Sequence, residues 1–278
     1  MERIQSALEK ARSRRGQELP EARSGKPRIK SESPREKQVA EAWDALKTFS
    51  PAPAILARNR VFTTDRGELS SHIDLLRTRT LLAMRDNKWN RMAVTSPNIG
   101  CGKTTTCLNL AFSIARQKEQ RVLLIEMDLR KPGMLKTIGL TENAPQFTRV
   151  LRGREAPDRH LLRLAPNLAI GANRKAAAQP SELLQSSDLH RILDELERIY
   201  QPTIMIFDMP PMLVSDEVMG FVDNVDCVLL MAAAGISSIK EIDTAEKDLT
   251  ERTNVLGVVL NKCRYTSKEY GYNYYNYG

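Results

Sequence analysis

The stretch VTSPNIGCGKTTT at residues 94–106 decides the fold, because it leads from an apolar run through a glycine-rich turn into a helix. Its second half fits the phosphate-binding pattern G-x-x-x-x-G-K-[ST], whereas Pro97 replaces the first glycine of that pattern. Glycines let successive backbone N–H groups surround phosphate oxygens, and the helix directs the positive end of its dipole at them. We therefore predict an ATP-binding loop made of Gly100, Cys101, Gly102, Lys103, Thr104 and Thr105.

Lys103 and Thr104 carry the chemistry of such a loop. The lysine ammonium would reach the β- and γ-phosphates, and the threonine hydroxyl would bind Mg²⁺. The alternative is an ordinary glycine-containing turn before a helix. A Gly-Lys-Thr triplet between a strand and a helix argues against that alternative, so we expect ATP and Mg²⁺ as cofactors.

Outward from this loop, short apolar runs alternate with longer helical stretches. Buried strands that alternate with helices are typical of a parallel sheet covered on both faces. We therefore predict an α/β fold of the P-loop NTPase type, with a mostly parallel sheet and helices on both faces. The predicted strands are RMAVTS (91–96), RVLLIEMD (121–128), TIMIFDMP (203–210), DCVLLMA (226–232) and NVLGVVLN (254–261), and the predicted helices cover 103–118, 181–200 and 238–252.

Acidic residues stand at the ends of two of these strands. Glu126 and Asp128 lie two residues apart, a spacing at which strand side chains point the same way, and Asp208 ends another strand. Ligands of open parallel sheets bind at the carboxyl ends of the strands. A single acid there is usually a helix cap or a solvated turn. Three of them beside a phosphate-binding loop favour a nucleotide site, with Asp208 organising Mg²⁺.

The positive charge of the chain is concentrated in its N-terminal arm. The net charge is +8, of which residues 1–60 contribute +6. Such an arm favours contact with nucleic acid, an anionic membrane surface or an acidic partner, or it is simply solvated. Two short amphipathic helices are predicted in it, and they either dock on a partner or pack on the chain's own core. Their apolar stripes are Ile4, Ala7, Leu8 and Ala11, and Val39, Ala42, Trp43 and Leu46.

Composition excludes several classes of protein. The longest apolar run, VLLMAAAGI, has nine residues, whereas a membrane span needs about 20, and the N-terminus has no signal-peptide core. The four cysteines lack metal-ligand spacing, which predicts reduced thiols in a cytoplasmic protein. We divide the chain into a helical and flexible N-terminal arm (1–60), a P-loop domain (61–262) and a disordered tail (263–278).

The tail has an unusual composition. YTSKEYGYNYYNYG, at residues 265–278, holds six of the chain's seven tyrosines, and it could extend over about 45 Å. A low-complexity segment that gained tyrosines by compositional drift is one interpretation. Behind a phosphate-binding loop, the cluster instead predicts tyrosine phosphorylation. The predicted sites are Tyr265, Tyr270, Tyr272, Tyr274, Tyr275 and Tyr277.

Four segments together resemble the bacterial tyrosine autokinases, or BY-kinases, that accompany capsule and exopolysaccharide synthesis. VTSPNIGCGKTTTCLNLA resembles their Walker A segment, VLLIEMDLRKP their Walker A′, QPSELLQSSDL their P-S-E-L-L segment and IMIFDMPPMLVSDEV their Walker B. The tyrosine-rich tail is a further hallmark of the family. The resemblance extends from about residue 61 to the end, and MERIQSALEKA is similar to the start of autokinases from exopolysaccharide loci.

The resemblance implies phosphoryl transfer from MgATP to the tail tyrosines, in trans between subunits, as a regulator of exopolysaccharide chain length or export. One Walker A′ acid is expected to accept the tyrosyl proton. The implied catalytic residues are Lys103, Glu126, Asp128 and Asp208, and the implied Mg²⁺ ligands are Thr104, Asp128 and Asp208. Asp216 and Asn261 match family positions near the nucleotide.

The resemblance also implies partners and a location. We expect a homo-oligomer that is activated by a membrane-embedded chain-length protein, or co-polymerase. The chain would be cytoplasmic and would lie at the inner face of the cell membrane through that partner. No nucleic-acid partner is expected.

Three positions depart from related patterns. Glu126 is longer by one methylene than the family's aspartate, and the oligomerisation signature E-x-x-R-x-x-R retains only Arg77, with Ser71 and Asp74 at its other positions. The wider MinD/ParA-like group carries a second loop lysine where this chain has Asn98, which favours the kinase branch. Two alternatives stay open: a MinD/ParA-like positioning ATPase without tyrosine chemistry, and a non-catalytic assembly factor that binds nucleotide.

Overall fold

The computed structural model describes residues 33–62 and 68–263. The first helix predicted in the arm and all six tail tyrosines lie outside the described residues. The described residues from Gln38 onward belong to one compact unit, and the other unit ends at Lys37. None of the helices in the described ranges combines the length and the apolar character that crossing a bilayer requires.

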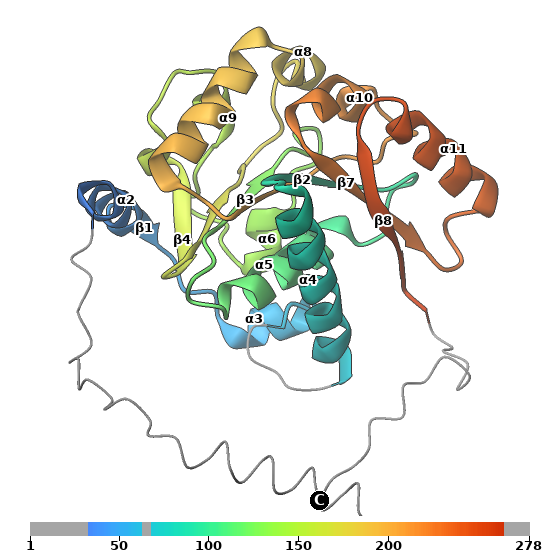
Figure 1. The fold of residues 1–278 in the computed structure, drawn as a ribbon, viewed down its shortest axis with the longest axis horizontal. Helices are drawn as coiled ribbons and strands as arrows, with labels where there is room; N and C mark the ends of the chain where they lie inside the picture. Colours follow the sequence, from blue (N-terminus) through green and yellow to red (C-terminus); the bar gives the residue numbers. More distant parts are fainter. Residues whose placement is uncertain (1–32, 63–67, 264–278) are drawn as a thin grey trace, which may run out of the picture. The chain divides into compact units, whose positions relative to one another are not determined.

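Within the described residues, eight strands form one sheet, in the order β1-β4-β5-β3-β6-β2-β7-β8 (Figure 1). Every neighbouring pair is parallel except β4 and β5, so the predicted α/β fold is confirmed. The strands are β1 (Lys47–Thr48), β2 (Arg91–Thr95), β3 (Val122–Glu126), β4 (Leu161–Ala165), β5 (Leu168–Gly171), β6 (Ile204–Asp208), β7 (Cys227–Ala233) and β8 (Asn254–Asn261).

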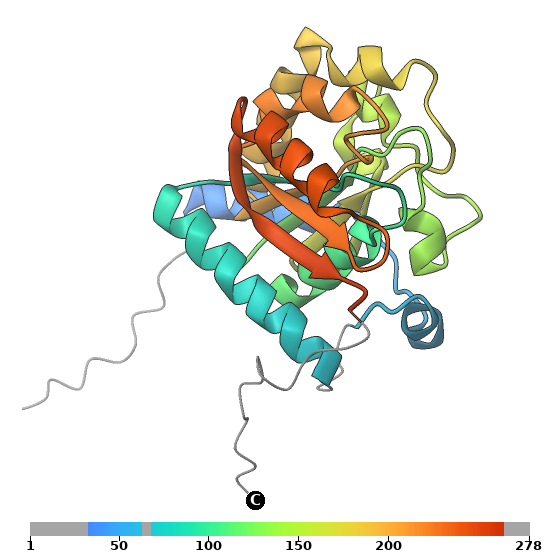
Figure 2. The same ribbon diagram turned by 90° about the vertical axis from the view of Figure 1, so that its right-hand side faces the viewer.

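Helices cover both faces of the sheet, as Figures 1 and 2 show from two sides. The core on one face is formed with α3 (Pro53–Arg58), α4 (Glu68–Asn87), α5 (Lys103–Ala115) and α6 (Met134–Ile138). The core on the other face is formed with α2 (Pro34–Asp44), α7 (Thr148–Leu151), α8 (Pro180–Leu184), α9 (Ser187–Tyr200), α10 (Glu217–Phe221) and α11 (Ile239–Thr250). The central strands β2, β3, β6 and β7 are buried along their whole length, because helices lie on both sides of them.

The second helix predicted in the arm is α2, and it packs on the chain's own core. Val39, Trp43 and Leu46 are buried, as the predicted stripe requires. The Trp43 indole N–H donates to the Tyr200 carbonyl over 2.9 Å, and the two rings meet edge to face at a centroid distance of 6.0 Å. Of the two alternatives for this helix, the structure therefore shows packing on the core.

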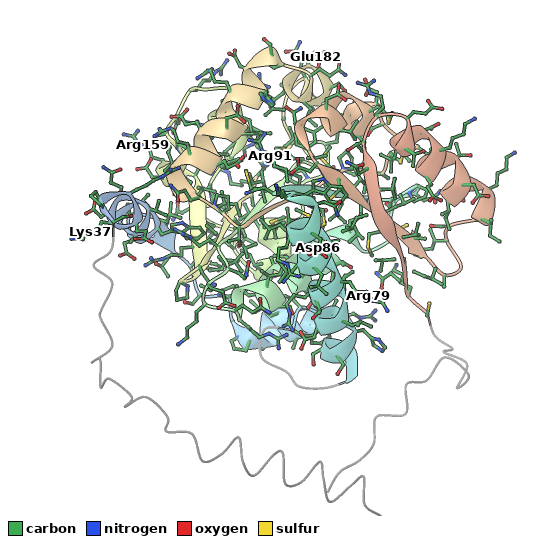
Figure 3. All side chains as sticks on the ribbon, in the orientation of Figure 1. Lys37, Arg79, Asp86, Arg91, Arg159 and Glu182 are labelled. Carbon is green, nitrogen blue, oxygen red and sulfur yellow. The ribbon has the colours of Figure 1, made fainter. Side chains whose placement is uncertain are left out.

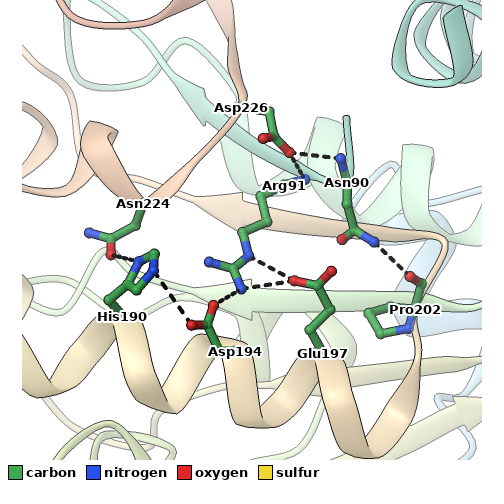
Figure 4. A network of polar contacts seen from close by, with 8 residues as sticks. All are labelled: Asn90, Arg91, His190, Asp194, Glu197, Pro202, Asn224 and Asp226. Atoms are coloured by element: carbon green, nitrogen blue, oxygen red, sulfur yellow. Dashed lines mark hydrogen bonds and ion pairs between the residues drawn. The ribbon is translucent and has the colours of Figure 1, made fainter. Parts of the chain in front are cut away.

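A polar network joins the amino end of β2 to α9 (Figure 4). The side chain of Arg91 is only 10% exposed and donates to Asp194 over 2.5 Å and to Glu197 over 2.8 Å. The Asp226 carboxylate accepts the backbone N–H groups of Asn90 and Arg91 over 2.7 and 2.8 Å. The network fixes the start of the central strand, about 13 Å from its other end.

The sequence-based helix over 181–200 is wrong in one respect, since the structure has two helices there. The helix is interrupted between α8 and α9. There the Ser186 hydroxyl caps α9 by accepting the Asp188 N–H over 3.3 Å. The strands β1, β4 and β5 were not predicted. The Asn167 side chain holds the β4–β5 turn by donating to three backbone carbonyls, those of Ala115, Gln117 and Gln120.

Candidate active site

The predicted phosphate-binding loop connects β2 to α5 and is shaped by two glycines. Gly100 and Gly102 have φ values of +83° and +90°, which side chains with a Cβ rarely adopt. A Cβ on Gly102 would also lie 2.4 Å from the side-chain nitrogen of Asn261. That Asn261 amide donates to the Cys101 carbonyl over 2.9 Å, so the last residue of β8 braces the loop.

Lys103 and Thr104 begin α5 and lie where the loop pattern predicts them. The Lys103 side chain is buried, and its ammonium donates to the Ser96 hydroxyl over 3.2 Å. The Ser96 hydroxyl in turn donates to the Asn98 carbonyl over 2.6 Å. The Thr104 hydroxyl lies near the Asp208 carboxylate and lowers its pKa. The Lys103 ammonium, which would bind phosphate, and the Thr104 hydroxyl, which would bind the metal, therefore both lie against the loop.

A second brace, which the sequence analysis did not single out, joins the loop to α11. The Asn98 side-chain N–H donates to Glu241 over 2.8 Å. The other oxygen of Glu241 accepts the Ser238 N–H over 2.8 Å in a capping box at the start of α11. The S-x-x-E spacing of 238–241 was a readable signal for the cap, although not for the contact with the loop.

Strand pairing brings the predicted acids to the loop. Glu126 at the end of β3 pairs with Asp208 at the end of β6, and Asp208 pairs with Val94 of β2. The backbone N–H of Asp128 donates to the Asp208 carbonyl over 3.0 Å. Neighbouring parallel strands thus gather all three acids at one edge of the sheet, as predicted.

Asp208 is a deeply buried acid of the Walker B segment. It is 1% exposed, and its Oδ2 has no hydrogen-bond partner within the described ranges. Burial raises the pKa of Asp208 to about 6, against the opposing effects of the Thr104 hydroxyl and the Lys103 charge. An unpaired, buried carboxylate oxygen beside a hydroxyl suits a cation.

Asp128 lies just beyond β3 and is partly buried. Its Oδ1 accepts the Lys131 N–H over 3.0 Å, which closes a turn. Burial raises the pKa of Asp128, while that hydrogen bond and the Lys103 charge lower it. Together with Thr104 and Asp208, it supplies the oxygen donors that Mg²⁺ prefers. The described residues hold no cluster of three or more His, Cys, Asp or Glu suited to a metal, but Mg²⁺ commonly takes its other ligands from phosphate and water.

Glu126 is 1% exposed and differs from the other two acids. Its Oε1 accepts the N–H groups of Gly133 and Met134, each over 2.7 Å, and its Oε2 accepts the Asn173 N–H over 2.8 Å. Burial raises the pKa of Glu126 to about 7, and the three hydrogen bonds oppose that rise. Both carboxylate oxygens are therefore engaged by backbone.

Arg130 connects three of the sequence motifs, which the sequence analysis did not foresee. Its guanidinium donates to Glu217 over 2.7 Å and to the Ser181 hydroxyl over 3.1 Å. The Ser181 hydroxyl donates to Asp216 over 3.0 Å. The Walker A′, P-S-E-L-L and Walker B segments thus meet beside the acids, and the only signal for this was the arginine within LRKP.

The remnant of the oligomerisation signature lies on α4 and is used within the chain. Asp74 accepts from the Ser113 hydroxyl over 2.7 Å and pairs with Arg116, while Arg77 pairs with Asp74 over 3.3 Å. Ser113 belongs to α5. These contacts join α4 to α5, so the described part of the chain uses Asp74 and Arg77 to pack one helix on another.

The class of protein follows from this loop and sheet. Residues 92–274 match the CobQ/CobB/MinD/ParA nucleotide binding domain, and the chain belongs to that family. Within it, the chain is 30% identical over 194 residues to the tyrosine-protein kinase CpsD of Streptococcus pneumoniae serotype 4, a match that covers 69% of this chain and 84% of the relative.

Further comparisons also find similarity to tyrosine kinases. The chain is 29% identical over 221 residues to the tyrosine-protein kinase YwqD of Bacillus subtilis, covering 78% of this chain and 92% of that one. The VpsO kinase domain superposes with a TM-score of 0.62 at 28% identity, over 71% of this chain and 96% of that chain. The chain is thus a member of the bacterial tyrosine kinases, as its motifs suggested.

Proposed function

We propose that this chain is a tyrosine autokinase that transfers the γ-phosphate of ATP to its own C-terminal tyrosines, in trans between subunits. The observation that carries the proposal is the meeting of the Gly-Lys-Thr loop with Asp208, whose buried Oδ2 lacks a partner in the described residues. The membership in the tyrosine kinases and the six tyrosines of residues 265–278 support it.

The loop residues would hold ATP through the backbone N–H groups from Gly100 to Thr105. Lys103 would leave Ser96 and bind the β- and γ-phosphates. Thr104 and Asp208 would hold Mg²⁺, which when bound neutralises the charge that develops on the phosphates, and Asp128 would be left free to accept a proton. Glu126 was assigned to the same catalytic group from the sequence.

The chemical step transfers one phosphoryl group. The tyrosyl oxygen forms a bond to the γ-phosphorus, and the bond from that phosphorus to the bridging oxygen of ADP breaks. The phenolic proton would pass to a carboxylate of the Walker A′ segment, and we propose Asp128, which lies near Lys103 and Asp208.

The product would act through charge. Each phosphate adds about −1.5 to −2 charges, so six of them add roughly −9 to −12 and exceed the chain's formal +8. We propose that this repulsion drives subunits or partners apart and thereby regulates exopolysaccharide chain length or export. The partner would be a membrane-embedded co-polymerase that holds the kinase, as an oligomer, at the inner face of the cell membrane.

The test is tyrosine phosphorylation of the purified protein in MgATP. Lys103→Met and a chain that ends at Arg264 are both expected to show no signal, while Lys118→Met, which changes an exposed lysine beyond α5, keeps it. Mixing the two silent variants supplies an intact site on one subunit and an intact tail on the other. Recovery of the signal in the mixture shows transfer in trans, whereas an intact chain that only hydrolyses ATP points to a positioning ATPase.

A further inference from the structure

The three acids at the edge of the sheet are not equivalent. Asp208 has an oxygen without a partner in the described residues, and Asp128 lies in a partly exposed turn. Glu126 is 1% exposed and accepts three backbone hydrogen bonds of 2.7, 2.7 and 2.8 Å. A carboxylate that accepts a substrate proton needs a lone pair directed at the substrate, and these contacts already engage both oxygens of Glu126.

The contacts of Glu126 join three segments of the chain. Gly133 and Met134 lie at the start of α6, and Asn173 follows β5. The Asn173 side chain adds to the connection, since its N–H donates to the Glu126 carbonyl over 3.3 Å and its oxygen accepts the Thr148 N–H over 2.9 Å. Residues 127–132, which include Asp128, therefore form a loop that Glu126 closes at its base.

We propose that Glu126 is a positioning residue that closes the loop carrying Asp128, and that Glu126 is not the acid that receives the tyrosyl proton. This inference rests on the proposed kinase function and deepens it. It separates two carboxylates that the sequence motif treats alike.

The length of the side chain explains why the residue is glutamate. Aspartate would be shorter by one methylene, or about 1.5 Å, so contacts of 2.7 Å would open to about 4 Å and cease to be hydrogen bonds. The pKa of about 7 at Glu126 would suit a general base if it were considered alone. The contacts decide against that role, because the carboxylate faces backbone N–H groups on both sides.

The first measurement is amide hydrogen exchange on the nucleotide-free full chain. In the unchanged protein the N–H groups of Gly133, Met134 and Asn173 are expected to be protected. In Glu126→Asp the protection of all three amides falls at least about tenfold, because the shorter side chain does not reach them. In Glu126→Gln one acceptor oxygen becomes NH₂, so the amides bound to that oxygen lose protection to the same degree. Asp128→Asn is the matched control and leaves the same three amides protected.

The second measurement is the rate of tyrosine phosphorylation as a function of pH. Asp128→Asn is expected to lose about 10²- to 10⁴-fold, the usual effect of removing a general base. In Glu126→Gln the residual activity keeps the acid limb of the pH–rate profile at the pH of the unchanged protein. Glu126→Asp is expected to be no more active than Glu126→Gln, although it carries a carboxylate where the glutamine variant carries an amide.

Two results would overturn the inference. One is a Glu126→Asp variant that stays active while Glu126→Gln is inactive, with the three amides protected in both. The other is a lack of protection at these amides in the unchanged protein, which needs no variant to fold. If no phosphotransfer is seen in any sample, the proposed function fails, whereas the exchange data still report whether Glu126 closes the loop.

Discussion

The buried carboxylate of Asp208 makes a sharp prediction about stability. The replacement Asp208→Asn removes its charge and keeps its shape. Burial raises the pKa of Asp208 from 3.8 to about 6 in the folded chain, so between these pH values the folded chain holds a proton that the unfolded chain has released. The folded state is therefore disfavoured as pH rises through this window, and the penalty is complete above it.

The magnitude follows from the shift. A rise of about 2.2 pKa units corresponds to on the order of 3 kcal/mol, at 1.36 kcal/mol per unit. The asparagine variant has no such penalty. The melting temperature of the variant minus that of the unchanged protein should therefore increase from pH 4 to pH 7, by about 6–12 °C for a domain of this size. The more stable variant should at the same time lose tyrosine phosphorylation, since selection for function and for stability conflict at such a site.

The assay is scanning calorimetry of nucleotide-free protein in chelator, at a series of pH values. Asp86→Asn is the control, because that carboxylate on α4 is 64% exposed (Figure 3). Its melting temperature should follow that of the unchanged protein at every pH. A gap between Asp208→Asn and the unchanged protein that stays constant with pH, or that narrows as pH rises, would refute the reasoning.

Three further predictions test other parts of the molecule. Arg91→Met should cost about 1–2 kcal/mol of unfolding free energy in a urea titration, because the acids it pairs with are partly exposed, yet should leave ATP affinity unchanged. Gly102→Ala should weaken ATP binding at least tenfold in a calorimetric titration. The new Cβ would displace Asn261, and a residue with a Cβ pays about 1–2 kcal/mol in the left-handed backbone conformation. Equal affinity would argue against the brace between Asn261 and the loop. Trp43→Ala should cost about 3–5 kcal/mol in the same urea titration, and a loss below 1 kcal/mol would mean that α2 does not belong to the core.

Much of the central sheet could be predicted from the sequence, because continuous apolar runs leave few alternatives. β2, β3, β6, β7 and β8 fall within the predicted segments. The convergence of Glu126 and Asp208 followed from the rule that parallel strands end at one edge. The edge strand β1 and its neighbour β4 were missed. Two residues are too few to show a pattern, and LLRLA at 161–165 carries a charge among its apolar residues.

The different surroundings of Glu126 and Asp128 could not be predicted from their spacing. The rule that residues two apart point the same way holds only within a strand, and β3 ends at Glu126. The partners of Glu126 come from Gly133 and Asn173, and nothing in the local sequence indicates that those backbone groups approach it. Contacts of this kind depend on the packing of segments that are distant in the chain.

The brace between Asn261 and the loop has a consequence for synthesis in the cell. Asn261 ends β8, the last strand among the described residues, and it contacts the carbonyl of a residue 160 positions earlier. At about 5–20 residues per second, a ribosome needs roughly 8–32 s to pass from one to the other. During that interval the nascent chain carries a Walker A segment without its brace, so full nucleotide affinity arises only after the whole domain has left the exit tunnel. The ATP site of this kinase is therefore completed by the end of β8, the strand that precedes the tyrosine-rich segment in the sequence.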